Sequence, residues 1–371
     1  MNIPNLTPVR AGFIPLVDCA VLVVAREKGF AANHGIDLKL SKEVSWANIR
    51  DRVNVGQFDV AHMLAGMPIA ANLSIGHIKV PMIAPMALGT GGNAITLSQD
   101  LYTELAASGL DLSAPLSAGQ ALRSAVERRR SQDLDPLTFA MVFPFSNHNY
   151  QLRYWMAAAG IDPERDVRLV VIPPPYMVQS LHAGQIDGFC VGEPWNRLAV
   201  EQGAGKILLK GSDVWPAEPE KVLGVQAAWA EQNGETLAAL LRALTQAANW
   251  ADDPDHHAAL ADILADPQYL DVSSALILKA LSGDLQFSGT AACAHAMWLY
   301  AQMVRWGQTP LSQTGEQFAC NTYRPDLLAA ALGEASPHIQ DTPLVLFDGK
   351  VFDPKDVPGY IAATPLNMHK I

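Results

Sequence analysis

Residues 9–40 read VRAGFIPLVDCAVLVVAREKGFAANHGIDLKL and contain two apolar segments on either side of a longer run that ends at a glycine. Val9–Leu16 predicts a strand, and Ile36–Leu40 predicts a second one. Between them, Asp18 can cap a helix over Cys19–Gly29, which stops at its glycine. A strand, a helix and a strand in this order form a parallel pair covered by the helix, so this stretch predicts an α/β fold.

The same alternation continues along the first two thirds of the chain. A helix from Ser45 to Gly56 and a strand over Phe58–Met63 extend the first series. The middle of the chain starts a second series, whose predicted strands are Leu137–Phe143, Val167–Ile172 and Asp187–Gly192. This repetition predicts parallel sheets covered by helices.

The two series predict two α/β lobes. We expect residues 1–97 to begin lobe 1, residues 98–220 to form lobe 2, and residues 221–371 to return to lobe 1 and add a helical C-terminal part. A turn is expected over residues 334–342. Ligands of open α/β sheets bind outside the carboxyl ends of the strands, so a ligand cleft is expected between the lobes.

The composition excludes several classes of protein. The chain has 371 residues, of which 49% are hydrophobic and 17% charged, which excludes a disordered chain. With 26 basic and 37 acidic residues the formal net charge is −11, which disfavours direct binding to nucleic acid. The cysteines are far apart in the sequence, at Cys19, Cys190, Cys293 and Cys320. We therefore expect no metal site, no disulfide framework and no cofactor.

The N-terminal segment MNIPNLTPVRAGFIPLVDCA does not have the form of a signal peptide, because Pro15 and Asp18 interrupt its apolar part. The longest uncharged stretch, Val80–Ser98, contains two prolines and three glycines, which a membrane-spanning helix would rarely tolerate. We expect a cytoplasmic protein that makes no contact with a membrane.

Hydrogen-bond donors recur at strand ends and helix starts. They are Trp46, Asn93, His148, the backbone around Val191 and Gly192, and Lys221. Four of them have a structural alternative: a packing tryptophan at Trp46, a flexible loop at Asn93, a histidine bonded to a carbonyl at His148 and a solvated lysine at Lys221. Beside Val191 and Gly192 the alternative is Cys190 as a nucleophile with His148 as its base, which a buried thiol in an apolar strand disfavours. No carboxylate pair, Ser-His-Asp order or metal cluster is expected beside them. Donors without bases predict a site that binds a small flat anion and leaves it unchanged.

Several motifs together resemble the NrtA/CmpA family of nitrate- and bicarbonate-binding proteins of ABC importers. They are EVSWANIRDRV, APMALGTGGNAIT, NHNYQLRYWMAAAGI, VIPPPYMV, DGFCVGEPWN, PEKVLGV and RWGQTP. The resemblance implies the two-lobed fold of type II periplasmic binding proteins. It also implies that the anion is lined by Trp46, Asn93, His148, Val191, Gly192 and Lys221, with Pro174 beside it.

At two positions, Lys221 and Asn93, this chain can be compared with the residues expected in the branches of that family. Lys221 resembles the nitrate branch, whereas the bicarbonate branch is thought to carry an acidic residue there that holds calcium. Asn93 departs from the glutamine expected in the importers and is one methylene shorter, which reduces its reach toward the anion.

The expected absence of a leader makes the chain similar to the NasS family of cytoplasmic nitrate/nitrite sensors. That resemblance implies two partners: nitrate or nitrite, and an RNA-binding antiterminator of the NasT type that is held without nitrate and released with it. One alternative is the substrate-binding component of a nitrate ABC importer. Another is an enzyme related to the thiamine-pyrimidine synthases, which would require a cysteine-rich motif.

Overall fold

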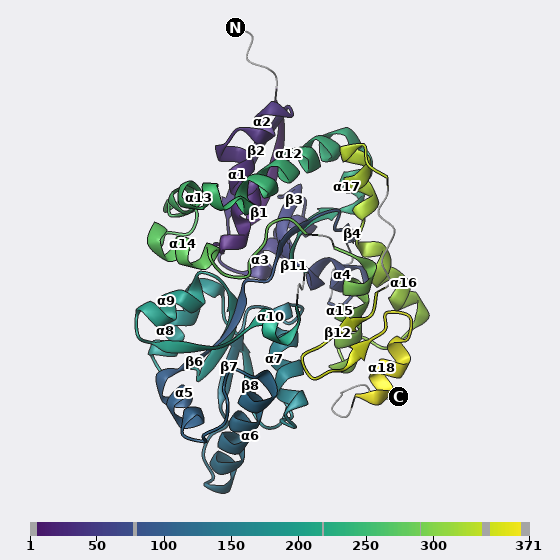
Figure 1. Cartoon of the computed structure of the whole chain (residues 1–371). Coiled ribbons are helices and arrows are strands. Elements are labelled where there is room, and N and C mark those ends of the chain that lie inside the picture. The colour runs from purple at the N-terminus through teal and green to yellow at the C-terminus, as the bar shows by residue number, and fades with distance from the viewer. Residues whose placement is uncertain (1–5, 77–79, 217–218, 290, 336–341, 365–371) are drawn as a thin grey trace.

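The computed structural model describes residues 6–76, 80–216, 219–289, 291–335 and 342–364, and within them two mixed sheets dominate (Figure 1). The first sheet has the order β2-β1-β3-β11-β4, and β5 also pairs with β11. Its strands are β1 (Thr7–Phe13), β2 (Ile36–Lys42), β3 (Val60–Leu64), β4 (Met82–Ile83), β5 (Ala87–Thr90) and β11 (Pro219–Gln226). The predicted turn over 334–342 lies mostly outside the described residues.

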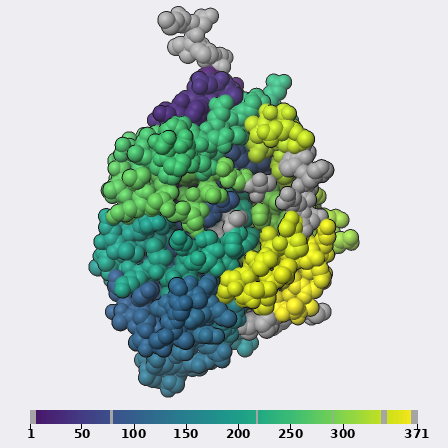
Figure 2. All heavy atoms as spheres, viewed as in Figure 1, coloured from purple at the N-terminus to yellow at the C-terminus, as the bar shows by residue number. Residues whose placement is uncertain are grey.

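The second sheet has the order β10-β6-β9-β7-β8. Its strands are β6 (Asn93–Ser98), β7 (Thr138–Met141), β8 (Arg168–Val171), β9 (Gly188–Gly192) and β10 (Gly205–Lys210). The helices that connect and cover these strands are α5 (Gln99–Ala106), α6 (Pro115–Ser131), α7 (Asn147–Ala158), η2 (Pro174–Tyr176), α8 (Met177–His182), α9 (Trp195–Glu201) and α10 (Gly211–Val214). In Figure 2 these elements, coloured blue to teal, form the lower half of the molecule.

The prediction of purely parallel sheets is right for part of each sheet and wrong for the rest. β1 pairs in parallel with β2 and β3, and β7 pairs in parallel with β8 and β9. By contrast, β11 is antiparallel to β3, and β6 is antiparallel to β9 and β10. The strands β6 and β11 enter their sheets from the other lobe, so no strand–helix–strand crossover sets their direction.

The helices of the first lobe cover both faces of its sheet. They are η1 (Val17–Cys19), α1 (Ala20–Glu27), α2 (Phe30–Asn33), α3 (Trp46–Asn54), α4 (Gly66–Asn72), α11 (Ala227–Gln232), α12 (Gly234–Asp252), η3 (Pro254–His256), α13 (His257–Leu264) and α14 (Ser274–Leu281). α1 packs against α12, and every residue from Ala20 to Ala25 is buried. Burial of apolar surface contributes roughly 25 cal/mol per Å² to the stability of the fold, so the packing of α1 stabilises the N-terminal elements.

The chain passes from the first sheet to the second through Gly91 and Gly92, which lie between β5 and β6. Both have positive φ, at 67° and 81°. A Cβ atom on Gly91 would lie 2.6 Å from the backbone oxygen of Asp284, so a side chain cannot fit there. This passage makes Asn93 the first residue of the second sheet and puts it beside the boundary between the lobes.

A helical region completes the chain. Its elements are α15 (Cys293–Arg305), α16 (Gln313–Thr322), α17 (Pro325–Leu332), β12 (Leu344–Val345), β13 (Val351–Phe352) and α18 (Val357–Ala363). Within the described residues, none of the helices combines the length and apolarity needed to cross a bilayer.

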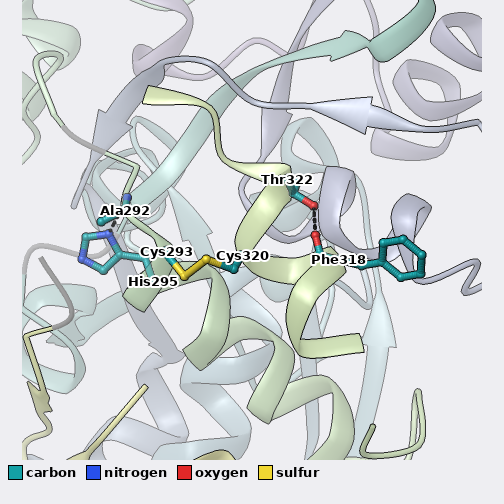
Figure 3. Close-up of a disulfide and its surroundings, with 6 residues drawn as sticks. All are labelled: Ala292, Cys293, His295, Phe318, Cys320 and Thr322. Carbon is teal, nitrogen blue, oxygen red and sulfur yellow. Dashed lines mark hydrogen bonds between the residues drawn. A yellow bond between two sulfur atoms is a disulfide. The ribbon is translucent and has the colours of Figure 1, made fainter. Parts of the chain in front are cut away.

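One disulfide joins Cys293 at the start of α15 to Cys320 near the end of α16 (Figure 3). The two residues are 27 positions apart in the sequence, but α15 and α16 fold back on each other and bring their Cα atoms to 4.6 Å. No disulfide framework was expected from the sequence, and this single bridge was not predicted, because only the tertiary fold brings the two cysteines together. Cys19 and Cys190 are buried thiols.

Candidate functional site

Side chains from both lobes meet around the ammonium group of Lys221, which is fully buried on β11. Its Nζ lies 2.6 Å from Oε1 of Glu220 and 2.8 Å from Oδ2 of Asp18. Neighbouring residues of a strand normally point to opposite faces. Here the register of β11 against β5 shifts on both sides of Lys221, and such an irregularity re-aims side chains, so Glu220 and Lys221 reach the same cluster.

Asp18 lies in η1, just before α1, and is nearly fully buried. Burial alone would raise its pKa, but Lys221 and His62 hold the pKa of this carboxyl well below its usual range. Its Oδ1 is 2.9 Å from Nε2 of His62 on β3. The prediction that Asp18 caps the following helix is wrong, since no side chain caps η1 or α1 and this carboxylate contacts two side chains of the cluster instead.

Glu220 is also fully buried and uses both of its oxygen atoms. Lys221 donates to Oε1 at 2.6 Å, and Nδ2 of Asn93 donates to Oε2 at 2.8 Å. Nε2 of His148 lies 3.2 Å from Oε1. Burial raises the pKa of Glu220, and although Lys221 opposes this shift, the direction remains upward.

His148 lies in the first turn of α7, which Ser146 caps by accepting from the backbone N–H of Asn149. Its Nε2 lies 2.6 Å from Oδ1 of Asn93. Because Nδ2 of Asn93 donates to Glu220, Oδ1 is the acceptor and Nε2 of His148 carries the proton. Burial, reinforced by Lys221, lowers the pKa of His148 well below its ordinary value. The structure therefore favours a neutral imidazole at His148.

Trp46 is the first residue of α3, which Ser45 caps. Its ring centroid lies 5.5 Å from Nζ of Lys221 and 5.4 Å from the ring of His62. Nε1 of Trp46 and Nδ1 of His148 are buried and have no hydrogen-bond partner among the described residues. An unsatisfied buried polar atom is costly, so each of these two atoms favours a further polar partner.

The remaining predicted residues lie at different distances from the cluster around Lys221. Gly192 is opposite Asn93 in the pairing of β9 with β6, and a Cβ atom there would lie 3.5 Å from Oδ1 of Asn93 and 3.6 Å from Oδ2 of Asp18. The next residue back, Val191, pairs with Ala94, and its carbonyl accepts from Asn196 at 2.7 Å.

Pro174 begins η2 after β8, and no hydrogen bond or ion pair of the described residues joins it to the cluster. After β9, Pro194 is the N-cap of α9.

Known proteins resemble the chain at the level of family, sequence and structure. The model of the NMT1-like family matches residues 2–265. The nitrate import ATP-binding protein NrtC of Synechocystis sp. is 37% identical over 94% of this chain and 54% of its own length, and the nitrate/nitrite binding protein NrtA of Synechococcus elongatus is 32% identical over 96% and 86%. The crystal structure of the periplasmic nitrate-binding protein NrtA from Synechocystis matches with a TM-score of 0.88 and 28% identity, over 98% of this chain and 100% of that one.

The chain belongs to the NMT1-like family and, within it, to the NrtA-type nitrate-binding family. The two-lobed periplasmic-binding-protein fold predicted from the resemblance is confirmed. The chain spans about half the length of NrtC and of similar curated relatives.

Sequence reasoning missed three members of the cluster in this NrtA-type chain: Asp18, His62 and Glu220. The expectation that no carboxylate pair accompanies the donors is wrong, because the two carboxylates lie on either side of the ammonium. Glu220 next to Lys221 was a signal in the sequence, but alternation along a strand points such neighbours apart. His62 sits in a fully buried strand and gave no signal.

The cluster combines fixed charge with neutral donors. Lys221 supplies the positive charge, whereas Asn93, His148 and Trp46 supply N–H groups. Among the described residues, no group of three or more acidic, histidine or cysteine side chains is arranged to hold a metal ion. Such a set can orient a small planar oxyanion through several charge-assisted hydrogen bonds, each of which contributes about 1.5–3 kcal/mol. The binding roles assigned from the sequence stay a prediction.

Proposed function

We propose that this chain binds nitrate or nitrite between its two lobes and acts as a cytoplasmic sensor of that anion. The observation that carries the binding proposal is the convergence of Asn93 and Lys221 on one planar carboxylate, that of Glu220, with Nε2 of His148 at 3.2 Å from the same carboxylate. A carboxylate and a nitrate ion are both planar, and any two oxygens of nitrate resemble the oxygen pair of a carboxylate, so donors that hold one are aimed to hold the other. The names of the NrtA relatives support the choice of anion.

The site binds the anion and leaves it chemically unchanged. Lys221 is held between Asp18 and Glu220, and His148 donates to Asn93, so both are engaged in holding and orienting. Closing the lobes around the anion excludes water and strengthens each of these contacts.

The sensor role requires that the bound anion changes the affinity for a partner protein. If the anion and an RNA-binding antiterminator of the NasT type prefer different arrangements of the lobes, each lowers the affinity for the other by the same factor. Shifting such an equilibrium from 1:99 to 99:1 takes about 5.5 kcal/mol, which two or three charge-assisted hydrogen bonds supply. The net charge of −11 suits a protein that acts through a basic partner and does not bind RNA itself.

A second candidate function is the substrate-binding component of a nitrate importer, located outside the cytoplasm. The disulfide between Cys293 and Cys320 favours it, because disulfides persist in oxidising compartments and are rare in the cytosol. The resemblance to periplasmic NrtA supports it as well.

Calorimetric titration with sodium nitrate and sodium nitrite, and with sodium chloride as the control, tests the binding proposal. We expect saturable heat with the first two salts only. Absence of heat with both would contradict it.

The oxidation state of the Cys293–Cys320 pair, measured in protein isolated from its native cells, distinguishes the two cellular roles. Reduced thiols, together with a bound RNA-binding protein that nitrate releases, support the sensor. An oxidised pair in a fraction outside the cytoplasm supports the importer component.

A further inference from the structure

The donors assigned to the anion are already held by a side chain of the protein. Lys221 donates to Oε1 of Glu220 at 2.6 Å, Asn93 donates to Oε2 at 2.8 Å, and Nε2 of His148 lies 3.2 Å from Oε1. Glu220 thus accepts from Lys221 and Asn93, while the Nε2–H of His148 donates to Oδ1 of Asn93 beside it. The geometry points to Glu220 as an internal ligand, whose carboxylate competes with the external oxyanion for these donors. This inference rests on the proposed function and adds a residue that sets the affinity.

Charge makes the competition unavoidable. Asp18 already balances Lys221, with 2.8 Å between the charged atoms. An ionised Glu220 adds a second negative charge, and an external anion on the same donors would add a third. Like charges in hydrogen-bond range at a buried site exclude one another unless one of them is neutralised. The external oxyanion therefore binds when Glu220 gains a proton from solvent, which changes Glu220 from an acceptor into an O–H donor.

Glu220 is the carboxyl group that can yield, and Asp18 is not. Asp18 contacts both Lys221 and His62, and these neighbours hold its pKa low, so it stays ionised and keeps the ammonium in place. Burial raises the pKa of Glu220, so its negative charge is the easier one to neutralise.

Other titratable groups also surround Glu220, on several elements. They are Asp18 of η1, His62 of β3, His148 of α7, Lys221 of β11 and Tyr323 after α16. Burial lowers the pKa of both histidines and raises the pKa of Tyr323 far above its ordinary value, so all three are neutral at neutral pH. The remaining group whose charge can follow the binding of an anion is Glu220.

The test is a nitrate titration of the full chain and of Glu220→Gln, which keeps the shape of the side chain but removes its charge. At about pH 8 we expect the variant to bind nitrate at least about tenfold more tightly than the unmodified chain. When the titration is repeated in buffers of different ionisation enthalpy, the change in binding enthalpy should show uptake of about one proton per nitrate by the unmodified chain and of none by the variant. Equal or weaker binding by the folded variant would overturn the inference.

Glu193→Gln is the matched control. Glu193 is also a largely buried carboxyl, just after the end of β9, but it pairs with Arg197 at 3.3 Å. Removing its charge should change nitrate affinity by less than about twofold, as expected for a paired charge outside the donor set. A gain as large as that of Glu220→Gln would mean that any lost negative charge suffices, and would overturn the role of Glu220 as a ligand.

A second variant keeps the inference testable if Glu220→Gln does not fold or if nitrate is not the anion. Glu220→Ala removes the internal ligand and leaves the Lys221 and Asn93 donors in place. Sodium formate, a minimal carboxylate, should then raise the melting temperature of the variant and not that of the unmodified chain. No effect of formate on the variant overturns the internal ligand. Failure with nitrate alone, combined with rescue by formate, contradicts the proposed function and keeps this inference.

Discussion

The two lobes contribute to the site in different ways. The first lobe brings the charges: Lys221, Glu220 and Asp18 form a compact set of ion pairs on β11 and η1. The second lobe brings neutral groups, Asn93 at the start of β6 and His148 at the start of α7. This division suits a site that closes around its ligand. The charges of one lobe are enough to attract an anion over a distance, whereas fixing its orientation requires contacts from both lobes.

The largest expected effect comes from the charged lobe. Lys221→Met keeps most of the side-chain volume but removes the ammonium, so nitrate affinity should fall by at least about 100-fold. The change also leaves two buried carboxylates without their cation, which lowers the free energy of unfolding by about 3–5 kcal/mol. Calorimetry and urea unfolding measure both effects. Lys206→Met, which removes an exposed ammonium on β10, is the control. Binding within about threefold of normal would show that the charge does not hold the anion.

The neutral lobe should give a smaller effect and leave the response to pH intact. His148→Gln replaces the rigid imidazole donor with a flexible amide and should weaken nitrate binding by about tenfold. Affinity of the unmodified chain should fall as pH rises, because the protonated form of Glu220 is the one that admits the anion. His148 stays neutral in that range, since its pKa is lowered, so its variant should keep the same slope. If the nitrate affinity of His148→Gln did not change with pH, the titrating group would be His148 of the second lobe and not Glu220.

Trp46 sharpens the comparison further, because it is a neutral donor carried by the charged lobe. Trp46→Phe removes the unpartnered Nε1 and retains most of the ring that lies 5.5 Å from Lys221. We expect nitrate affinity to fall by about three- to tenfold, as for one neutral hydrogen bond. Titration calorimetry measures it, and unchanged affinity would mean that the indole N–H does not meet the anion.

The smallest effect on binding should come from the disulfide. Reducing Cys293–Cys320 removes a constraint on the unfolded chain and should lower the free energy of unfolding by about 2–4 kcal/mol. Nitrate affinity should stay the same, because neither cysteine contributes a polar group to the cluster. Paired denaturation and titration curves, with and without reductant, measure the two quantities. A large loss of affinity would link the α15–α16 hairpin to the site.

Features that are local in the sequence were predictable. Ser45 and Ser146 each precede a helix and accept a backbone hydrogen bond as its N-cap, as serine commonly does. These caps determine where Trp46 and His148 lie. The strands of both series follow from apolar runs of strand length. Lys221 stands out because a lysine at the start of an apolar strand is unusual.

Features that depend on tertiary pairing were not predictable. Asp18 has the sequence position of a helix cap, and only the approach of β11 gives it Lys221 as a partner. Glu220 joins the cluster because the register of β11 is irregular, which a strand pattern does not reveal. The antiparallel strands and the Cys293–Cys320 bridge depend on how the chain passes between lobes and folds back at its end.

A crystal structure of the full chain grown with sodium nitrate tests the central claim most directly. We predict one nitrate ion between the lobes, with its oxygens in hydrogen-bond contact with Lys221 and Asn93, and with Glu220 no longer accepting from both of them. A structure in which Glu220 still holds these donors while nitrate lies elsewhere, or is not bound at all, would contradict the account.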